Sequence, residues 1–174
     1  VYLTQKGMLL DLGGIAKGFI ADQLWNFFKK EGVTTAVIDL GGNIVVMGGS
    51  PARDGVAWNV GLQDPFESRG TTLGTILEKE KTIVTSGIYE RQLVVDGKTY
   101  HHIFDRATGY PMETEVASIT ILAKKSVDCE IWTTRLFGQN PYKIIEEIEQ
   151  YPELEAFVIT KNQKMMYTSG IQFV

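Results

Sequence analysis

Apolar residues recur with the spacing of an amphipathic helix between residues 15 and 30. The polar positions of this stretch, such as Lys17 and Asp22, fall on the opposite side. Gly32 follows as a helix-ending residue. The pattern therefore predicts a helix over residues 15–30, with one apolar face formed by Ile15, Phe19, Ile20, Leu24, Phe27 and Phe28.

The rest of the chain is dominated by short apolar runs bounded by turn residues, which is typical of strands. The Asp96-Gly97 pair and the segment 39–43 each predict a hairpin turn. Two more helices are predicted over residues 128–137 and 141–149, the second with Asn140 as its cap. The predicted strands are residues 9–12, 35–38, 44–47, 58–62, 72–77, 82–85, 91–96, 98–104, 117–123, 157–159 and 165–167.

These elements indicate an α+β fold, with antiparallel, hairpin-rich sheets and packed helices, in a single domain over residues 1–174. The net charge of -4 comes without a basic stripe, which argues against a nucleic-acid partner. Cys129 is the only cysteine, so no intrachain disulfide can form. No apolar run approaches the ~20 residues that a membrane-spanning helix needs.

Candidate chemistry begins with the segment Asp11-Leu12-Gly13-Gly14-Ile15-Ala16-Lys17-Gly18. A strand-like run, residues 8–10, leads into two glycines that open the predicted helix. Free N–H groups at a helix start, with a lysine in the first turn, suit a phosphate or another anion. The spacing fits neither the Walker motif nor the dinucleotide fingerprint. The alternatives are an ordinary glycine turn and a solvated Lys17.

Four further segments follow in a fixed order. They are Asp39-Leu40-Gly41-Gly42-Asn43, Ser86-Gly87-Ile88-Tyr89-Glu90-Arg91, the run from His102 to Gly109, and a late aspartate. With residues 11–18 they resemble the ApbE family of FAD:protein FMN transferases. Its members carry DLGGIAKG, VDLGGN, SGxYER and HIxDPxTG segments before a metal-binding aspartate. Here Arg106 and Ala107 replace the usual proline and arginine.

The resemblance implies a T-fold-like structure and a site for FAD, the expected substrate. It places seven residues at or near the flavin nucleotide: Gly13, Gly14, Lys17, Phe19, Gly41, Gly42 and Ile103. The motif also selects one of the two neighbouring histidines, since adjacent strand side chains point to opposite faces. This is His102, expected to take the proton from an acceptor hydroxyl. Asp105 is expected to hold a turn.

The resemblance also implies Mg²⁺, which needs few protein ligands when substrate oxygens complete its shell. The family's ligands correspond here to the Ala16 carbonyl and the Asp128 carboxylate, with a threonine expected four residues later. Trp132 stands at that position, and Thr133 comes next. Either an irregular helix start lets Thr133 reach the metal, or this ligand is lost. A further alternative is that Asp128 caps the helix.

The leading expectation is a Mg²⁺-dependent transfer of FMN from FAD to a serine or threonine hydroxyl of an acceptor flavoprotein, with AMP leaving. One alternative is an FAD pyrophosphatase that gives FMN and AMP. Another is a flavin-binding module without catalysis, which Trp132 at the threonine position favours. The resemblance further implies a preceding N-terminal part. A signal or lipid anchor there would be the only route to the membrane, giving an extracytoplasmic or membrane-associated bacterial location, with the cytoplasm as the alternative.

Overall fold

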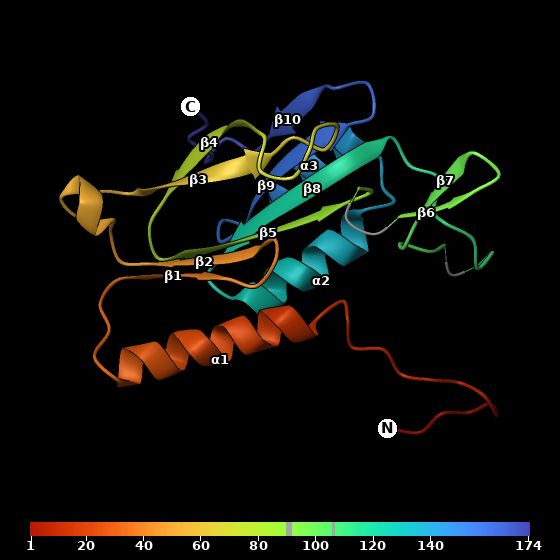
Figure 1. The fold of residues 1–174 in the computed structure, drawn as a ribbon, viewed down its shortest axis with the longest axis horizontal. Coiled ribbons are helices and arrows are strands. Elements are labelled where there is room, and N and C mark those ends of the chain that lie inside the picture. The colour runs from red at the N-terminus through yellow and green to blue at the C-terminus, as the bar shows by residue number, and fades with distance from the viewer. Residues whose placement is uncertain (90–91, 106) are drawn as a thin grey trace.

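A computed structural model of the chain describes residues 1–89, 92–105 and 107–174. Glu90 and Arg91 of the SGxYER-like segment, and Arg106 of the segment after His102, lie outside the described residues. Figure 1 shows a mixed structure in which helices cover one side of an antiparallel sheet. This confirms the α+β class and the antiparallel organisation expected from the sequence.

The main sheet has six strands in the order β1-β2-β5-β8-β9-β10, and every neighbouring pair is antiparallel. Two separate hairpins, β3–β4 and β6–β7, complete the strands of the described chain. The bounds are β1 Ala36–Asp39, β2 Asn43–Met47, β3 Trp58–Gln63, β4 Thr72–Glu78, β5 Lys81–Gly87, β6 Gln92–Val95, β7 Lys98–His101, β8 Val116–Ala123, β9 Glu155–Thr160 and β10 Met165–Tyr167.

Three α-helices lie against this sheet: α1 (Ala16–Lys30), α2 (Ser126–Leu136) and α3 (Pro141–Ile148). A short 3₁₀ helix, η1, spans Pro51–Arg53. The Asn140 side chain accepts a hydrogen bond from the Tyr142 N–H, which confirms the predicted cap of α3. No helix in the described part of the chain combines the length and apolarity needed to cross a bilayer.

Strand β8 is buried along its whole length because both faces of the sheet are covered. On one face Ile119 and Ile121 pack with α2 and α3, through residues such as Leu136 and Ile144. On the other face Leu122 packs with residues of β3–β4. Helix α1 forms a smaller apolar cluster with β1 and β2. The sheet is thus the middle layer, and the polar side of α1 is left near α2.

The predicted strand at residues 9–12 is wrong. The structure has no strand before α1 in the described chain, and Leu9 and Leu10 are 93% and 60% exposed. A strand is stabilised by a hydrogen-bonded neighbour, and no described segment pairs with these residues. Figure 1 shows the N-terminal segment extending beyond the sheet before it enters α1.

Candidate active site

The close crossing of α1 and α2 sets the geometry of the site. A Cβ added to Gly18 would lie 2.7 Å from the Ser126 carbonyl oxygen and 2.8 Å from Glu130 Cγ. Contacts this short exclude any side chain unless a helix moves. Gly18 therefore lets the first turn of α1 lie directly on α2.

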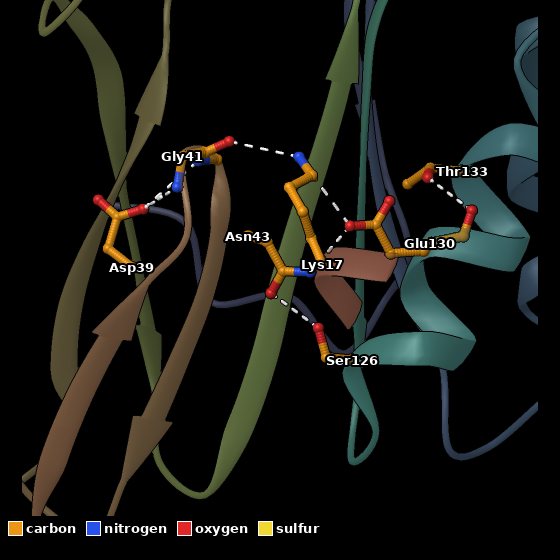
Figure 2. Close-up of polar contacts among 8 residues, drawn as sticks. Lys17, Asp39, Gly41, Asn43, Ser126, Glu130 and Thr133 are labelled. Atoms are coloured by element: carbon orange, nitrogen blue, oxygen red, sulfur yellow. Dashed lines mark hydrogen bonds and ion pairs between the residues drawn. The ribbon is translucent and has the colours of Figure 1, made fainter. Parts of the chain in front are cut away.

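A buried polar cluster fills the space where these helices meet the turn after β1. The Asn43 Nδ2 group donates to Glu130 Oε1 at 2.9 Å, and the Ser126 hydroxyl donates to Asn43 Oδ1 at 2.7 Å. Asn43, Ser126 and Glu130 are all buried. Figure 2 shows Lys17 reaching into the same group of side chains. We refer to Lys17, Asn43, Ser126 and Glu130 as the junction.

Lys17 is the cation of the junction. Its Nζ atom donates to the Gly41 carbonyl oxygen at 3.4 Å and lies 4.0 Å from Glu130 Oε1. The lysine side chain is 38% exposed, whereas the Glu130 side chain is 6% exposed. Lys17 is therefore held between a carbonyl and a carboxylate while one side of it stays open to solvent. The sequence left a solvated lysine and a phosphate partner as alternatives for this residue.

Three backbone N–H groups of the glycine turns already donate hydrogen bonds to aspartates of the same turns. The Gly13 N–H donates to Asp11 Oδ1 at 2.6 Å, while the Gly41 and Gly42 N–H groups donate to Asp39 Oδ1 at 2.9 and 3.4 Å. Gly41 and Gly42 have φ values of 70° and 86°, which favour glycine. The Gly13 N–H, expected to be free for an anion, is therefore engaged by Asp11 in this conformation, and the Gly41 and Gly42 N–H groups are likewise engaged by Asp39.

Helix α2 begins earlier than the sequence suggested. Lys125 is the cap residue, and the carboxylate of Asp22 in α1 accepts hydrogen bonds from the Ser126 and Val127 N–H groups at 2.7 and 3.1 Å. Asp128 is therefore inside the first turn, and its expected role as the cap is wrong. It stands two residues before Glu130, roughly 200° round the helix. Asp128 thus lies on the side opposite the junction.

The two threonines of α2 have different environments. Thr133 is fully buried, and its hydroxyl donates to the Glu130 carbonyl oxygen at 3.1 Å. Thr134 is four residues after Glu130 and shares its helix face. Its Oγ1 atom lies 3.8 Å from the position of a Cβ added to Gly14. The carboxylate and threonine with the i, i+4 spacing beside α1 are therefore Glu130 and Thr134.

Trp132 faces a different neighbour. Its ring centroid is 4.9 Å from that of Tyr151, and the Arg135 guanidinium lies 4.6 Å above the Trp132 ring. Counting four residues from Asp128 led to Trp132, whereas counting from Glu130 leads to Thr134. The argument for a non-catalytic module from Trp132 therefore loses its basis. Glu130 was not among the residues predicted from the sequence, although its i, i+4 spacing to Thr134 was a signal for it.

The junction suits a hard cation better than a soft one. The described residues contain no group of three histidine, cysteine or carboxylate side chains able to hold a metal. Mg²⁺ does not need such a group, because it binds through one or two carboxylates and keeps waters or substrate phosphates. The Glu130 carboxylate, the Thr134 hydroxyl and the carbonyl of Ala16, the first residue of α1, are donors of the right chemistry.

The two histidines lie on opposite sides of the chain, as expected. His101 ends β7, and its Nε2 atom is 2.9 Å from the Met112 carbonyl oxygen. Burial lowers the pKa of the His101 imidazole, and the charges of Lys161 and His102 lower it further, although the Met112 carbonyl opposes the shift. His102 is exposed. His102 is therefore the more accessible of the two histidines to a reactant from solvent.

Short local contacts fix the segment around His102. The Ile103 N–H donates to His101 Nδ1 at 3.3 Å, and the Ile103 carbonyl accepts from the Met112 N–H at 2.9 Å. Asp105 Oδ1 accepts from the Ala107 and Thr108 N–H groups at 2.8 and 2.9 Å, which confirms its turn role. Ile103 is partly buried against the core, so its side chain supports the segment.

An aromatic contact ties this segment to α2. The His101 and Phe137 rings meet edge to face with centroids 6.1 Å apart. Phe137 follows Thr134 by three residues, which is roughly 4.5 Å along a helix. Two hollows of about 570 and 640 Å³ share Glu113, Gly138 and Gln139 in their linings. Neither hollow is lined by Lys17 or Glu130, so the junction is not part of them.

Two further residues considered from the sequence are Phe19 and Cys129. Phe19 is 58% exposed on the outer side of α1. The lone cysteine, Cys129, is buried, and burial raises the pKa of its thiol. A thiol in this state is a poor nucleophile, so Cys129 is a core residue.

Comparisons with known proteins identify relatives of this chain. The FAD:protein FMN transferase of Klebsiella pneumoniae (strain 342) is 39% identical over 169 residues, covering 97% of this chain and 51% of that protein. The FAD:protein FMN transferase of Treponema pallidum (strain Nichols) is 36% identical, covering 98% of this chain and 49% of that protein. This chain therefore spans about half the length of these relatives.

Solved structures show the same fold. The ApbE protein of Thermotoga maritima superposes with a TM-score of 0.83 at 28% identity, covering 94% of this chain and 52% of that one. The flavin transferase ApbE of Vibrio cholerae gives a TM-score of 0.74 at 27% identity, covering 92% and 50%. The model of the ApbE family matches residues 1–158. With the motifs in order and the fold shared, the chain belongs to the ApbE family.

Proposed function

We propose that the protein containing this chain transfers FMN from FAD to a serine or threonine hydroxyl of an acceptor flavoprotein in a Mg²⁺-dependent reaction. The observation that carries the proposal is the junction, where Lys17 and the Glu130 carboxylate meet beside the first turn of α1. The names of the relatives from Klebsiella pneumoniae and Treponema pallidum supply the reaction class.

Glu130, Thr134 and the Ala16 carbonyl are the proposed metal ligands, in place of Asp128 and Thr133. Glu130 and Thr134 share the α2 face that meets α1, whereas Asp128 lies on another face and the Thr133 hydroxyl is bonded to its own helix. Bound Mg²⁺ supplies neutralisation of the charge that develops on the pyrophosphate oxygens. Lys17 adds positive charge on the open side of this site.

His102 is the proposed general base. Its exposure lets an acceptor hydroxyl reach the imidazole, which removes the hydroxyl proton as the oxygen attacks the FMN-side phosphorus. A bond forms between the acceptor oxygen and this phosphorus. The bond to the bridging oxygen of the pyrophosphate breaks, and AMP leaves with that oxygen. The His101 contacts with Met112 and Phe137 hold the segment that carries His102.

AMP release from FAD, with and without Mg²⁺ and an acceptor flavoprotein, tests the proposal. Chromatography measures AMP, and in-gel flavin fluorescence after denaturation measures FMN bound to protein. Mg²⁺-dependent AMP with bound FMN supports the transferase. Mg²⁺-dependent AMP without bound FMN replaces it by the pyrophosphatase. Flavin binding without AMP replaces it by the binding module.

A further inference from the structure

The junction already holds a cation, the ammonium group of Lys17. It lies between a backbone carbonyl oxygen, that of Gly41, and a carboxylate oxygen of Glu130. Carbonyl and carboxylate oxygens are also the ligands that Mg²⁺ takes in proteins. Figure 2 shows Lys17 reaching across from α1 to both acceptors. The lysine therefore occupies a position suited to a divalent cation.

The oxygen groups around the ammonium are held more firmly than the ammonium itself. Asn43 fixes Glu130 Oε1 at 2.9 Å, and Ser126 fixes Asn43 at 2.7 Å. The two contacts of Lys17, at 3.4 and 4.0 Å, are near the upper limits for a hydrogen bond and an ion pair. The Lys17 side chain is also 38% exposed. The lysine can therefore leave while the acceptors stay in place.

We propose that Lys17 is an internal counter-ion that competes with the divalent cation for Glu130. Without metal, its ammonium group neutralises the buried Glu130 carboxylate. When the metal binds Glu130, the two positive charges repel each other, and Lys17 turns toward solvent, where a phosphate can meet it. The inference rests on the proposed function, which makes Glu130 a metal ligand. It adds that metal binding and the availability of Lys17 are linked.

Metal binding without flavin tests this competition. Mn²⁺ is titrated into the protein and its free concentration followed by electron paramagnetic resonance, with Mg²⁺ as competitor. Lys17→Met removes the competing charge and is expected to tighten Mn²⁺ binding at least tenfold. Lys17→Arg retains the charge and is expected to bind as the parent does or more weakly. Lys29→Met is the matched control, because Lys29 pairs with Glu80 at 3.8 Å on another part of α1.

A Lys17→Met variant that binds Mn²⁺ no more tightly than Lys29→Met overturns the competition. Glu130→Gln separates this result from failure of the proposed function. Loss of Mn²⁺ binding in Glu130→Gln supports Glu130 as a ligand, whether or not Lys17 competes with the metal. Unchanged binding in Glu130→Gln would show that Glu130 is not a metal ligand, which overturns this part of the proposed function.

A second measurement uses the unmodified protein, so it does not depend on a variant folding. Brief acetylation with acetic anhydride, followed by mass spectrometry, reports how accessible each lysine amine is. Saturating Mg²⁺ is expected to increase Lys17 labelling several-fold and to leave Lys29 unchanged. Equal Lys17 labelling with and without Mg²⁺, under conditions where metal binding is measured, contradicts the proposal.

Discussion

The junction and the segment that directly follows the β6–β7 hairpin carry the two halves of the proposed chemistry, but they are built differently. Asn43 bonds to Ser126 and Glu130 across 83 and 87 residues of sequence, inside the protein. The hairpin pairs residues that are close together in the sequence, and Leu93 and Val94 on it are 64% and 63% exposed. The junction therefore exists only when the whole fold forms, whereas the hairpin needs a few anchoring contacts to hold it in place.

This difference teaches where function and stability are coupled. A two-stranded hairpin is marginal by itself, and β6–β7 is held on the protein through His101, Phe137 and the pairing of Ile103 with Met112. The His102 side chain makes none of these anchoring contacts. Substitutions of His102 are therefore expected to change chemistry alone. Substitutions in the junction are expected to change folding as well.

His102→Ala gives the largest expected effect. Loss of a general base lowers a rate typically 10²- to 10⁴-fold, so transferase turnover is expected to fall by roughly that factor. Thermal unfolding is expected to stay within about 1 °C of the parent, because the side chain is exposed. Val94→Ser, on the same hairpin, is the control and should change neither quantity. Equal losses of turnover and melting temperature would give His102 a structural role instead.

Asn43→Asp tests the junction as a folding element. The change puts a second carboxylate against Glu130 in a buried site and removes the Nδ2 donor. We expect it to lower the free energy of unfolding by about 1–3 kcal/mol, measured by urea denaturation. In the double variant Asn43→Asp with Glu130→Gln, the new amide at position 130 can donate to the new carboxylate at position 43. The hydrogen bond is then restored with its direction reversed.

Recovery in that double variant sharpens the comparison. A coupling energy of about 0.5–3 kcal/mol is expected for two residues in direct contact. Strictly additive losses would show that Asn43 and Glu130 do not stabilise the fold through their hydrogen bond. Mn²⁺ binding by the double variant should remain lost, since it lacks the Glu130 carboxylate.

Gly18→Ala is expected to have a smaller effect, because two contributions oppose each other. Alanine favours a helix over glycine by about 1 kcal/mol. Here its Cβ would lie 2.7 Å from the Ser126 carbonyl oxygen, and overpacking of this kind costs about 1–3 kcal/mol. A net loss of up to about 2 kcal/mol in urea denaturation follows from these two values. Asn26→Ala on the exposed side of α1 is the control and should be neutral or stabilising. A stabilised Gly18→Ala would mean that the two helices separate readily.

The sequence predicted the parts of this structure that local patterns determine. The bounds of helix α1 were predicted closely, and the turn between β1 and β2 follows from its aspartate and glycines. The predicted apolar face of α1 is wrong in part, because the helix packs through Ala21, Leu24 and Phe28 and leaves exposed Ile15, Phe19, Ile20 and Phe27. The strand predicted at residues 9–12 failed because its apolar run has no described strand to pair with. A ladder is a property of two segments, and one segment alone cannot reveal it.

The site was harder to predict for a related reason. The start of α2 is set by Asp22, which lies 104 residues before Ser126 in the sequence. Counting from Asp128 therefore led to a residue on the helix face away from the junction, whereas the proposed ligand Glu130 lies on the face that meets α1. The histidine pair was easier, because alternation along a strand is local. His101 and His102 differ in exposure as predicted, although β7 ends at His101, before the end of the predicted strand at residue 104.

The smallest expected effect concerns the pH dependence of the hairpin anchor. Because burial lowers the pKa of His101 in the folded protein, folding favours the neutral ring. The contribution of His101 to stability is therefore present above the unfolded pKa of about 6.5 and declines as the pH falls through that value. We expect His101→Gln to reduce the stability lost between pH 7.5 and 5.5 by about 0.5 kcal/mol or less, measured by urea denaturation at each pH. Val94→Ser, on the exposed side of the β6–β7 hairpin, is the control, since neither side chain titrates in this range, and it should keep the slope of the parent. Identical slopes for both variants and the parent would mean that the hairpin releases His101 before the ring gains its proton, and the anchor would then be weaker than its contacts to Met112 and Phe137 suggest.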